Sequence, residues 1–340
     1  MHPYFHPTTL LVLDDDAYYV ESFKFHFGDQ FPCVAYTQPE RAIEHLLSQE
    51  NQRPRFDKVL QAAATRSEVG HETADADSRG CHQIRRIMSD PNRFRRVSVL
   101  VVDYDMPTMT GLQVCRAIRH LPVRKLLLTG KAGVDIAISA FNEGVIDTFL
   151  TKHDAEIQKT LPRQVLRLQD EYFKSTTEAL GAAIGRREAP FLADAGVQEA
   201  IAELVKGRGI VEQYAIAQPP GVVLVDHKGQ AMILAVMDGD SLRAQWEVAR
   251  ENGAPPELLQ LLSSMRVLPL FPTASGYYEK DVAASWSGHL HPASRIDQDR
   301  IWHTALVRAD QVPHIQPKGL ATFAAFEEAQ AEGLSGQQSH

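Results

Sequence analysis

The stretch Val97-Ser98-Val99-Leu100-Val101-Val102 decides the fold, and it runs directly into Asp103. Short apolar runs of this kind are typical of strands that are buried on both faces of a parallel sheet. Four similar runs occur elsewhere in the first half of the chain, and segments with helical spacing separate them. These runs are residues 10–13, 33–36, 126–129 and 148–151. The alternation predicts an α/β fold with a doubly wound, five-stranded parallel sheet within residues 1–155.

Polar side chains stand where these predicted strands end. Asp14 and Asp15 follow the first strand, Asp103 ends the third, Thr129 ends the fourth and Lys152 follows the fifth. The carboxyl ends of parallel strands meet at one edge, which is where such sheets bind ligands. Three carboxylates brought together repel one another unless a cation lies between them, and hard oxygen ligands suit Mg²⁺. We therefore expect a magnesium site at this edge.

These residues resemble the receiver (CheY-like) domain of two-component response regulators. The resemblance rests on four motifs and covers about residues 8–155, apart from a long insert. The motifs are Leu13-Asp14-Asp15-Asp16, the run Asp103-Tyr104-Asp105-Met106-Pro107 with Gly111 four residues later, Thr129-Gly130 and Thr151-Lys152. Each motif alone is common, but their joint order, each at a predicted strand end, is hard to obtain by chance.

The resemblance implies a phosphoryl-transfer site. Asp103 is the expected phosphoacceptor, whose carboxylate attacks a phosphohistidine to give an acyl phosphate. Lys152 is expected to pair with the phosphoryl oxygens and Thr129 to donate its hydroxyl to them. Phe149 stands where the family keeps its switch aromatic. The implied partner is a histidine kinase or a phosphotransfer protein.

The resemblance also implies how Mg²⁺ is bound. Asp15 and Asp103 are expected to hold it together with the backbone carbonyl of Asp105, and Asp14 is expected to bind it directly or through water. When bound, Mg²⁺ neutralises charge in the loose phosphoryl transition state.

Two features depart from the family pattern. His153 stands where the family usually has a proline, often after a cis bond; a cis bond before a non-proline residue costs about 3 kcal/mol, so we expect a trans bond. The interval from Asp14 to Asp103 is 89 residues, about twice the family's, because of an insert at about 48–96. Neither departure removes a site residue, so phosphorylation is expected. The alternative is a degenerate receiver that only docks to another protein.

The insert at 48–96 contains ten Lys and Arg against seven Asp and Glu, so it is mildly basic. A structureless loop of this length is unusual inside a compact domain. We expect helical pieces at 56–64 and 82–88 and a mobile tip at 72–78. The insert is expected to be dispensable for phosphorylation and to affect the choice of partner.

The second half carries fewer signals. Residues 156–186 are predicted to form a long amphipathic helix and a linker. The helix is expected from about residue 155 to residue 180, and the linker follows it. An α+β output domain is predicted over 187–326 from helical segments and a β-hairpin, with a polar tail at 327–340. Residues 186–340 hold 13 Lys and Arg against 19 Asp and Glu, a net charge of −6. DNA binding requires a basic surface, so direct nucleic-acid binding is disfavoured.

The leading hypothesis is a response regulator, not itself an enzyme, that relays phosphorylation of Asp103 to an output domain that binds a protein or a small ligand. The alternative is an enzymatic output that acts on a nucleotide, and a third is an unfamiliar DNA-binding output. His289, His291 and His303 could ligate a metal but read better as ordinary polar residues. The aromatic residues of this half predict a small core or a ligand pocket; they are Tyr277, Tyr278, Trp286 and Trp302.

Other features bound the setting of the protein. No run approaches the roughly 18 apolar residues of a membrane span, and the N-terminus does not resemble a signal peptide. Three widely spaced cysteines, Cys33, Cys81 and Cys115, fit a reducing cytoplasm. The apolar stripe of the helix at 155–180 is longer than one sheet would cover, so its last part is expected to meet the output domain or a second copy of the chain. A homodimer through this helix is expected.

Overall fold

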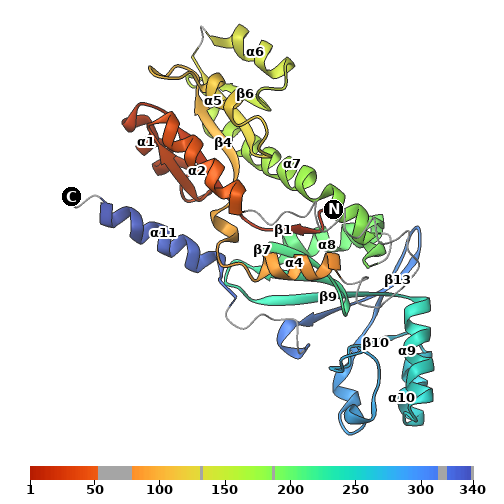
Figure 1. The fold of residues 1–340 in the computed structure, drawn as a ribbon. Helices are drawn as coiled ribbons and strands as arrows, with labels where there is room; N and C mark the ends of the chain where they lie inside the picture. The colour runs from red at the N-terminus through yellow and green to blue at the C-terminus, as the bar shows by residue number, and fades with distance from the viewer. Residues whose placement is uncertain (53–78, 131–132, 186–187, 313–319, 338–340) are drawn as a thin grey trace. The chain divides into compact units, whose positions relative to one another are not determined.

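The computed structural model describes residues 1–52, 79–130, 133–185, 188–312 and 320–337. The chain forms two compact units, and Figure 1 shows their elements. The parallel unit consists of described residues 7–52, 92–178 and 329–337. The antiparallel unit consists of described residues 1–6, 79–91 and 179–328. Within the described residues, no helix is long and apolar enough to span a membrane.

A five-stranded sheet with all strands parallel forms the parallel unit, as the sequence predicts. The strand order is β3-β2-β4-β5-β6, so the chain builds outward on one side of β2 and then on the other. The strands are β2 (Thr9–Leu13), β3 (Cys33–Tyr36), β4 (Val97–Asp103), β5 (Arg124–Thr129) and β6 (Thr148–Thr151). Every residue of β2 and β4 is buried, which explains why both strands are mostly apolar.

Five helices cover this sheet, and alternate strand residues point to opposite faces. They are α1 (Ala17–Phe27), α2 (Pro39–Gln52), α5 (Gly111–Ala117), α6 (Val134–Asn142) and α7 (Ile157–Gly185). Val99 and Val101 pack with residues of α1 and α7 on one face. Leu100 and Val102 pack with residues of α2, α5 and α6 on the other. The helices therefore cover both faces and leave the strand ends as the edge for a site.

A six-stranded antiparallel sheet forms the centre of the antiparallel unit, in the order β1-β7-β8-β9-β13-β12. Its strands are β1 (Tyr4–Phe5), β7 (Ile210–Ala217), β8 (Pro220–Asp226), β9 (Ala231–Asp238), β12 (Ser294–Asp297) and β13 (Ile301–Arg308). The β-hairpin expected in this half of the chain is formed by β8 and β9. This antiparallel sheet with helices is consistent with the predicted second α+β domain.

Further elements complete this unit. They are α4 (Arg79–Met88), α8 (Ala195–Arg208), α9 (Gly239–Glu251), α10 (Pro256–Ser263), the short strand pair β10 (Val267–Pro269) and β11 (Leu290–Pro292), and α11 (Phe323–Gln337), which begins there. Tyr278 lies in a small core between α9 and α10, and Trp286 packs against that core. Trp302 is also buried. These aromatics therefore have the core role that the sequence analysis considered.

The unit boundaries differ from the predicted ones at two places. Residues 1–6 were expected in the first domain, but β1 pairs with β7 in the antiparallel sheet. The helix expected at 82–88 within the insert is α4, which packs on β7. The insert therefore contributes to the antiparallel unit although it interrupts the sequence of the parallel one. The expected helix at 56–64 and the expected tip at 72–78 lie outside the described residues.

The long helix α7 buries its apolar stripe, the last part of which was expected to meet the output domain or a second copy of the chain. Leu161, Val165 and Leu168 lie in the core of the parallel unit. Tyr172 and Leu180, further along the helix, are buried as well. Leu166 is the large apolar residue of α7 that remains accessible, with 58% of its surface exposed. A dimer contact on this helix therefore has to use the face that carries Leu166.

Candidate functional site

Strand register brings the predicted site residues to one edge of the parallel sheet. Leu13 is paired with Val102, so Asp14 and Asp103 end neighbouring strands. Asp103 pairs with Leu128, which places Thr129 one residue further along β5. These strands, β2 and β4, are also where the chain changes its direction of growth across the sheet. In open α/β sheets this switch point is the usual ligand site.

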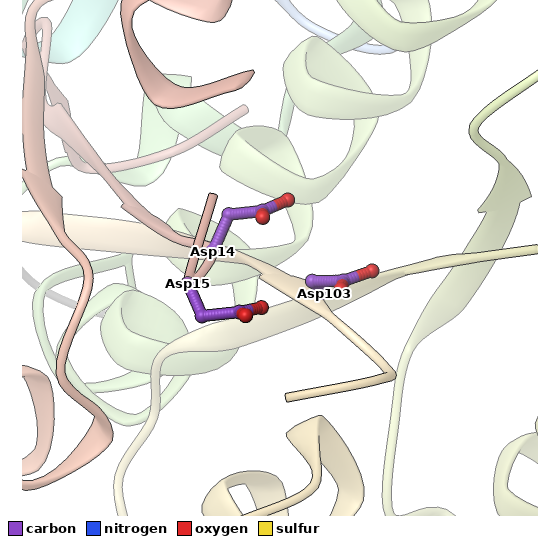
Figure 2. Close-up of side chains that lie close together, drawn as sticks. All are labelled: Asp14, Asp15 and Asp103. Atoms are coloured by element: carbon purple, nitrogen blue, oxygen red, sulfur yellow. The ribbon is translucent and has the colours of Figure 1, made fainter. Parts of the chain in front are cut away.

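Three carboxylates converge at this point, as Figure 2 shows. Asp14, Asp15 and Asp103 each place one oxygen within 4.8 Å of the other two, which is close enough to hold a metal ion. Asp14 and Asp103 are buried and Asp15 is exposed. An all-oxygen set that is open on one side suits Mg²⁺, which keeps several of its waters when it binds to proteins. The donor chemistry of this site therefore fits the predicted ion.

Lys152 holds two of these carboxylates together. Its Nζ donates to Asp14 Oδ2 at 2.7 Å and lies 2.9 Å from Asp103 Oδ1. Burial raises the pKa of Asp103, and the hydrogen bond and charge of Lys152 offset this only in part. Burial lowers the pKa of Lys152, but its hydrogen bonds to Asp14 and Asp103 and the charges of these two carboxylates together outweigh burial and leave that pKa raised. Lys152 is therefore a firmly protonated cation between two acids.

Tyr19 is a site residue that the sequence analysis missed. Its ring lies under Lys152, with the ammonium nitrogen 4.4 Å from the ring centroid, a cation–π contact. Burial raises the pKa of Tyr19 to about 12, and the charge of Lys152 opposes that shift. Its position in the sequence could have indicated this role. Asp16 caps α1, so Tyr19 lies in the first turn of that helix, beside the acids.

Thr129 is fully buried at the end of β5, and its hydroxyl donates to the Gly130 carbonyl at 3.1 Å. Gly133 approaches it closely, because a Cβ on Gly133 would lie 2.2 Å from Thr129 Oγ1 and 3.2 Å from the ring of Tyr104. Any side chain at position 133 would therefore displace the Thr129 hydroxyl from its place in the site. The sequence analysis missed Gly133, and its position after Thr129-Gly130 was the signal available.

The remaining predicted residues lie as follows. Phe149 on β6 is half-buried and packs against the core on the α2, α5 and α6 face. Asp105 is exposed in the loop after β4. Within the described residues the single cis peptide is Gln218–Pro219, so the Lys152–His153 bond is trans, as expected.

The three histidines of the antiparallel unit do not come together in the way the acids do. His291 on β11 pairs with Leu268, and His303 on β13 pairs with Met237. Burial lowers the pKa of all three, His289 included. In the part of the chain that the structure describes, the carboxylates Asp14, Asp15 and Asp103 are the one group of three or more such ligands close enough for a metal.

A solved structure shows the same architecture over nearly the whole chain. The response regulator LqsR of Legionella pneumophila matches with a TM-score of 0.73 and 23% sequence identity, over 96% of this chain and 95% of that chain. The parallel unit has the receiver fold. Partial matches include an adenylate cyclase from Rhodopirellula baltica (TM-score 0.34, 18% identity, 51% of this chain and 94% of that chain). Another is a response regulator receiver domain protein from Clostridium thermocellum (TM-score 0.31, 16% identity, 48% and 94%). No protein-family model and no curated protein matches the sequence.

Proposed function

We propose that this protein is a response regulator that accepts a phosphoryl group on Asp103. The observation that carries the proposal is the buried Asp103 carboxylate at the switch point of a receiver fold, hydrogen-bonded to Lys152 and flanked by Asp14 and Asp15. The phosphoryl donor is a phosphohistidine on a histidine kinase or on a phosphotransfer protein. The proposed location is the cytoplasm.

The transfer is a displacement at phosphorus. A carboxylate oxygen of Asp103 forms a bond to the phosphorus atom while the bond to the histidine nitrogen breaks. The histidine leaves as a neutral imidazole after it takes up a proton, and Asp103 becomes an acyl phosphate. Because Lys152 already touches Asp103, its ammonium lies where it can pair with the incoming phosphoryl oxygens. Thr129 at the same edge turns its hydroxyl from the Gly130 carbonyl to the phosphoryl group, and Phe149 follows as the switch residue.

The carboxylates of Asp14, Asp15 and Asp103, with the backbone carbonyl of Asp105, would hold Mg²⁺. When bound there, the ion supplies positive charge that offsets the charge of the phosphoryl group. Asp15, the exposed member, has no other role in the site, whereas Asp14 also accepts a hydrogen bond from Lys152. The two acids therefore contribute differently to ion binding.

We propose that the output domain binds a small ligand or a protein and does not bind DNA. Residues 186–340 carry a net charge of −6, which opposes contact with a polyanion. The antiparallel unit also contains a cavity of small-molecule size. Both observations support an output that binds a small ligand or a protein.

Asp15→Ala and Lys152→Ala are expected to have different effects on Mg²⁺ affinity. Asp15→Ala removes an ion ligand, so the affinity falls by about tenfold or more. Lys152→Ala removes a cation that competes for Asp14 and Asp103, so the affinity is kept or rises. Isothermal titration of the full chain with MgCl₂ measures both, with Asp105→Asn, an exposed carboxylate of the same loop, as control. Equal losses in the two variants would contradict the assignment.

Homodimerisation is the second consequence we propose, and it is expected to depend on phosphorylation. Beryllofluoride mimics the phosphoryl group, so with Mg²⁺ it should shift the monomer–dimer equilibrium 5- to about 150-fold, the usual range of coupling between two sites. Sedimentation of the full chain measures this shift. Leu166→Glu on α7 tests the helix, since Leu168 is in the core and its substitution would unfold the unit. A monomer under every condition would rule out the dimer, and an unchanged Leu166→Glu dimer would exclude α7.

The proposed function as a whole is tested by incubating the full chain with acetyl phosphate and Mg²⁺ and recording the intact mass. The expected result is a mass increase of one phosphoryl group that disappears when EDTA removes the ion. A chain that gains no phosphoryl group under these conditions would support the degenerate receiver that only docks to a partner.

A further inference from the structure

The antiparallel unit contains a cavity of about 600 Å³, and none of its lining residues belongs to the receiver motifs. Its lining comes from one unit only: α4, the turn between β7 and β8, strand β9 and the segment 269–276 after β10, with Val312. Small-molecule sites in proteins have volumes of roughly 300–1,000 Å³ and combine apolar walls with a few polar groups. The size of this cavity is therefore that of a ligand site.

The walls divide into an apolar part and a cationic part. Met237, Leu270 and Phe271 supply apolar surface. On α4, His82 and Arg85 lie one turn apart, and both line the cavity. None of the described residues that line the cavity is acidic. The charge of this surface therefore favours an anion.

Arg85 has hydrogen-bonding capacity to spare. One terminal nitrogen donates to the Gln218 carbonyl at 3.2 Å, on the same cavity wall. A guanidinium has five N–H donors, and within the described part of the chain no carboxylate pairs with this one. The remaining donors suit a carboxylate, sulfonate or phosphate group, which can accept two parallel hydrogen bonds from arginine.

The cavity is preformed by fixed contacts. Glu188 accepts hydrogen bonds from the backbone N–H groups of Gly80, at 3.3 Å, and Cys81, at 2.9 Å, and so anchors the start of α4. Elsewhere around the cavity, Gln218 donates to the Ala274 carbonyl at 2.9 Å and Gln245 donates to the Gly276 carbonyl at 3.1 Å. Because these segments are tied before any ligand arrives, little ordering cost opposes binding.

Cys81 also lines the cavity, but it is not suited to covalent chemistry. Burial raises the pKa of its thiol strongly, and the nearby Glu188 carboxylate raises it further. The thiolate is the nucleophilic form, so a cysteine in this environment is unreactive. The cavity surface is therefore one for reversible binding.

We propose that this cavity binds a small organic anion, whose apolar body lies against Met237, Leu270 and Phe271 and whose anionic group pairs with Arg85. The proposal names a ligand class for the output domain of the proposed function. It rests on the proposed function only because it takes the antiparallel unit to be that output domain. It does not depend on phosphorylation of Asp103, so either claim can fail while the other stands.

The position of α4 in the chain gives this site a direct covalent connection to the receiver fold. Arg85 precedes Val97, the first residue of β4, by 12 residues, and β4 ends at Asp103. The insert, whose role the sequence leaves open, thus contributes the cationic wall of the cavity.

Two fluorescent probes with nearly the same apolar body test the proposal. The anion 8-anilinonaphthalene-1-sulfonate carries a sulfonate, and N-phenyl-1-naphthylamine lacks it. Both are titrated into the full chain and into three variants: Arg85→Gln, Arg86→Gln and Ala217→Phe. Arg86 is the matched control, because it is the next residue of α4, is exposed and does not line the cavity. Ala217→Phe adds bulk to the wall.

We expect Arg85→Gln to weaken binding of the sulfonate probe about tenfold, the lower end for a hydrogen bond to a charged group, and to leave the uncharged probe within about twofold. Arg86→Gln should change neither, and Ala217→Phe should weaken both. Unchanged sulfonate binding in Arg85→Gln, or an equal loss in Arg86→Gln, would overturn the proposal. Circular dichroism melting of each variant shows whether it folds. Arg85 is only half-buried, so Arg85→Gln is expected to fold and decides the test even if Ala217→Phe does not fold.

Discussion

Asp103→Asn is expected to abolish phosphorylation by acetyl phosphate completely, which is the largest effect any single substitution should have on this protein. The amide keeps the shape of the side chain, and its oxygen can still accept a hydrogen bond from Lys152, which now touches Asp103 Oδ1 at 2.9 Å. It lacks the anionic oxygen that forms the bond to phosphorus. Radiolabelled acetyl phosphate with Mg²⁺ and the full-length variant provide the measurement.

Asp105→Asn is the matched control for that experiment. Asp105 lies two residues further on, is exposed and is expected to contribute only its backbone carbonyl. Its amide variant should therefore label as the unmodified chain does. Label retained on Asp103→Asn, or lost from Asp105→Asn to the same degree, would contradict the assigned acceptor.

Gly111→Ala is expected to lower the free energy of unfolding of the parallel unit by about 1–3 kcal/mol, the usual cost of forcing extra volume into a packed site. Gly111 begins α5, and a Cβ there would lie 2.1 Å from the Asp103 carbonyl oxygen and 3.1 Å from Leu127 Cδ1. The strand end that carries Asp103 has to move to make room. Mg²⁺ affinity should therefore fall together with stability.

Urea unfolding followed by far-ultraviolet circular dichroism measures the effect of Gly111→Ala. Trp246, Trp286 and Trp302 all lie in the antiparallel unit, so tryptophan fluorescence reports that unit separately. Gly130→Ala is the control, since a Cβ there has no atom within 4 Å. If Gly111→Ala unfolds at the same urea concentration as Gly130→Ala, the close approach to Asp103 has no energetic consequence and the prediction is wrong.

Much of the parallel unit could be predicted because its signals are local. The strands are buried on both faces, so each is a short apolar run, and β3 and β6 begin and end at the predicted residues. The site residues could be placed for the same reason: each directly follows or ends a strand. Tyr19 and Gly133 were missed because their roles depend on contacts with Lys152 and Thr129, which no sequence pattern records.

The antiparallel unit was harder to predict because its signals are mixed or non-local. Strand β7 was not predicted, since Glu212 interrupts its apolar pattern, although Glu212 is buried and accepts a hydrogen bond from the Tyr214 hydroxyl. Strand β1 has two residues, and its partners lie more than 200 positions away in the sequence. The cavity walls come from segments between Cys81 and Val312, so only the folded chain brings them together.

The most direct test of the central claim locates the phosphoryl group itself. An acyl phosphate is reduced by borohydride to an alcohol, which converts a phosphorylated aspartate into homoserine, while free carboxylates are unchanged. The full chain is treated with acetyl phosphate and Mg²⁺, reduced, digested and sequenced by mass spectrometry. We predict homoserine at position 103 and aspartate at positions 14, 15 and 105. Homoserine at position 14, 15 or 105, or no homoserine anywhere in the chain, would contradict phosphorylation of Asp103.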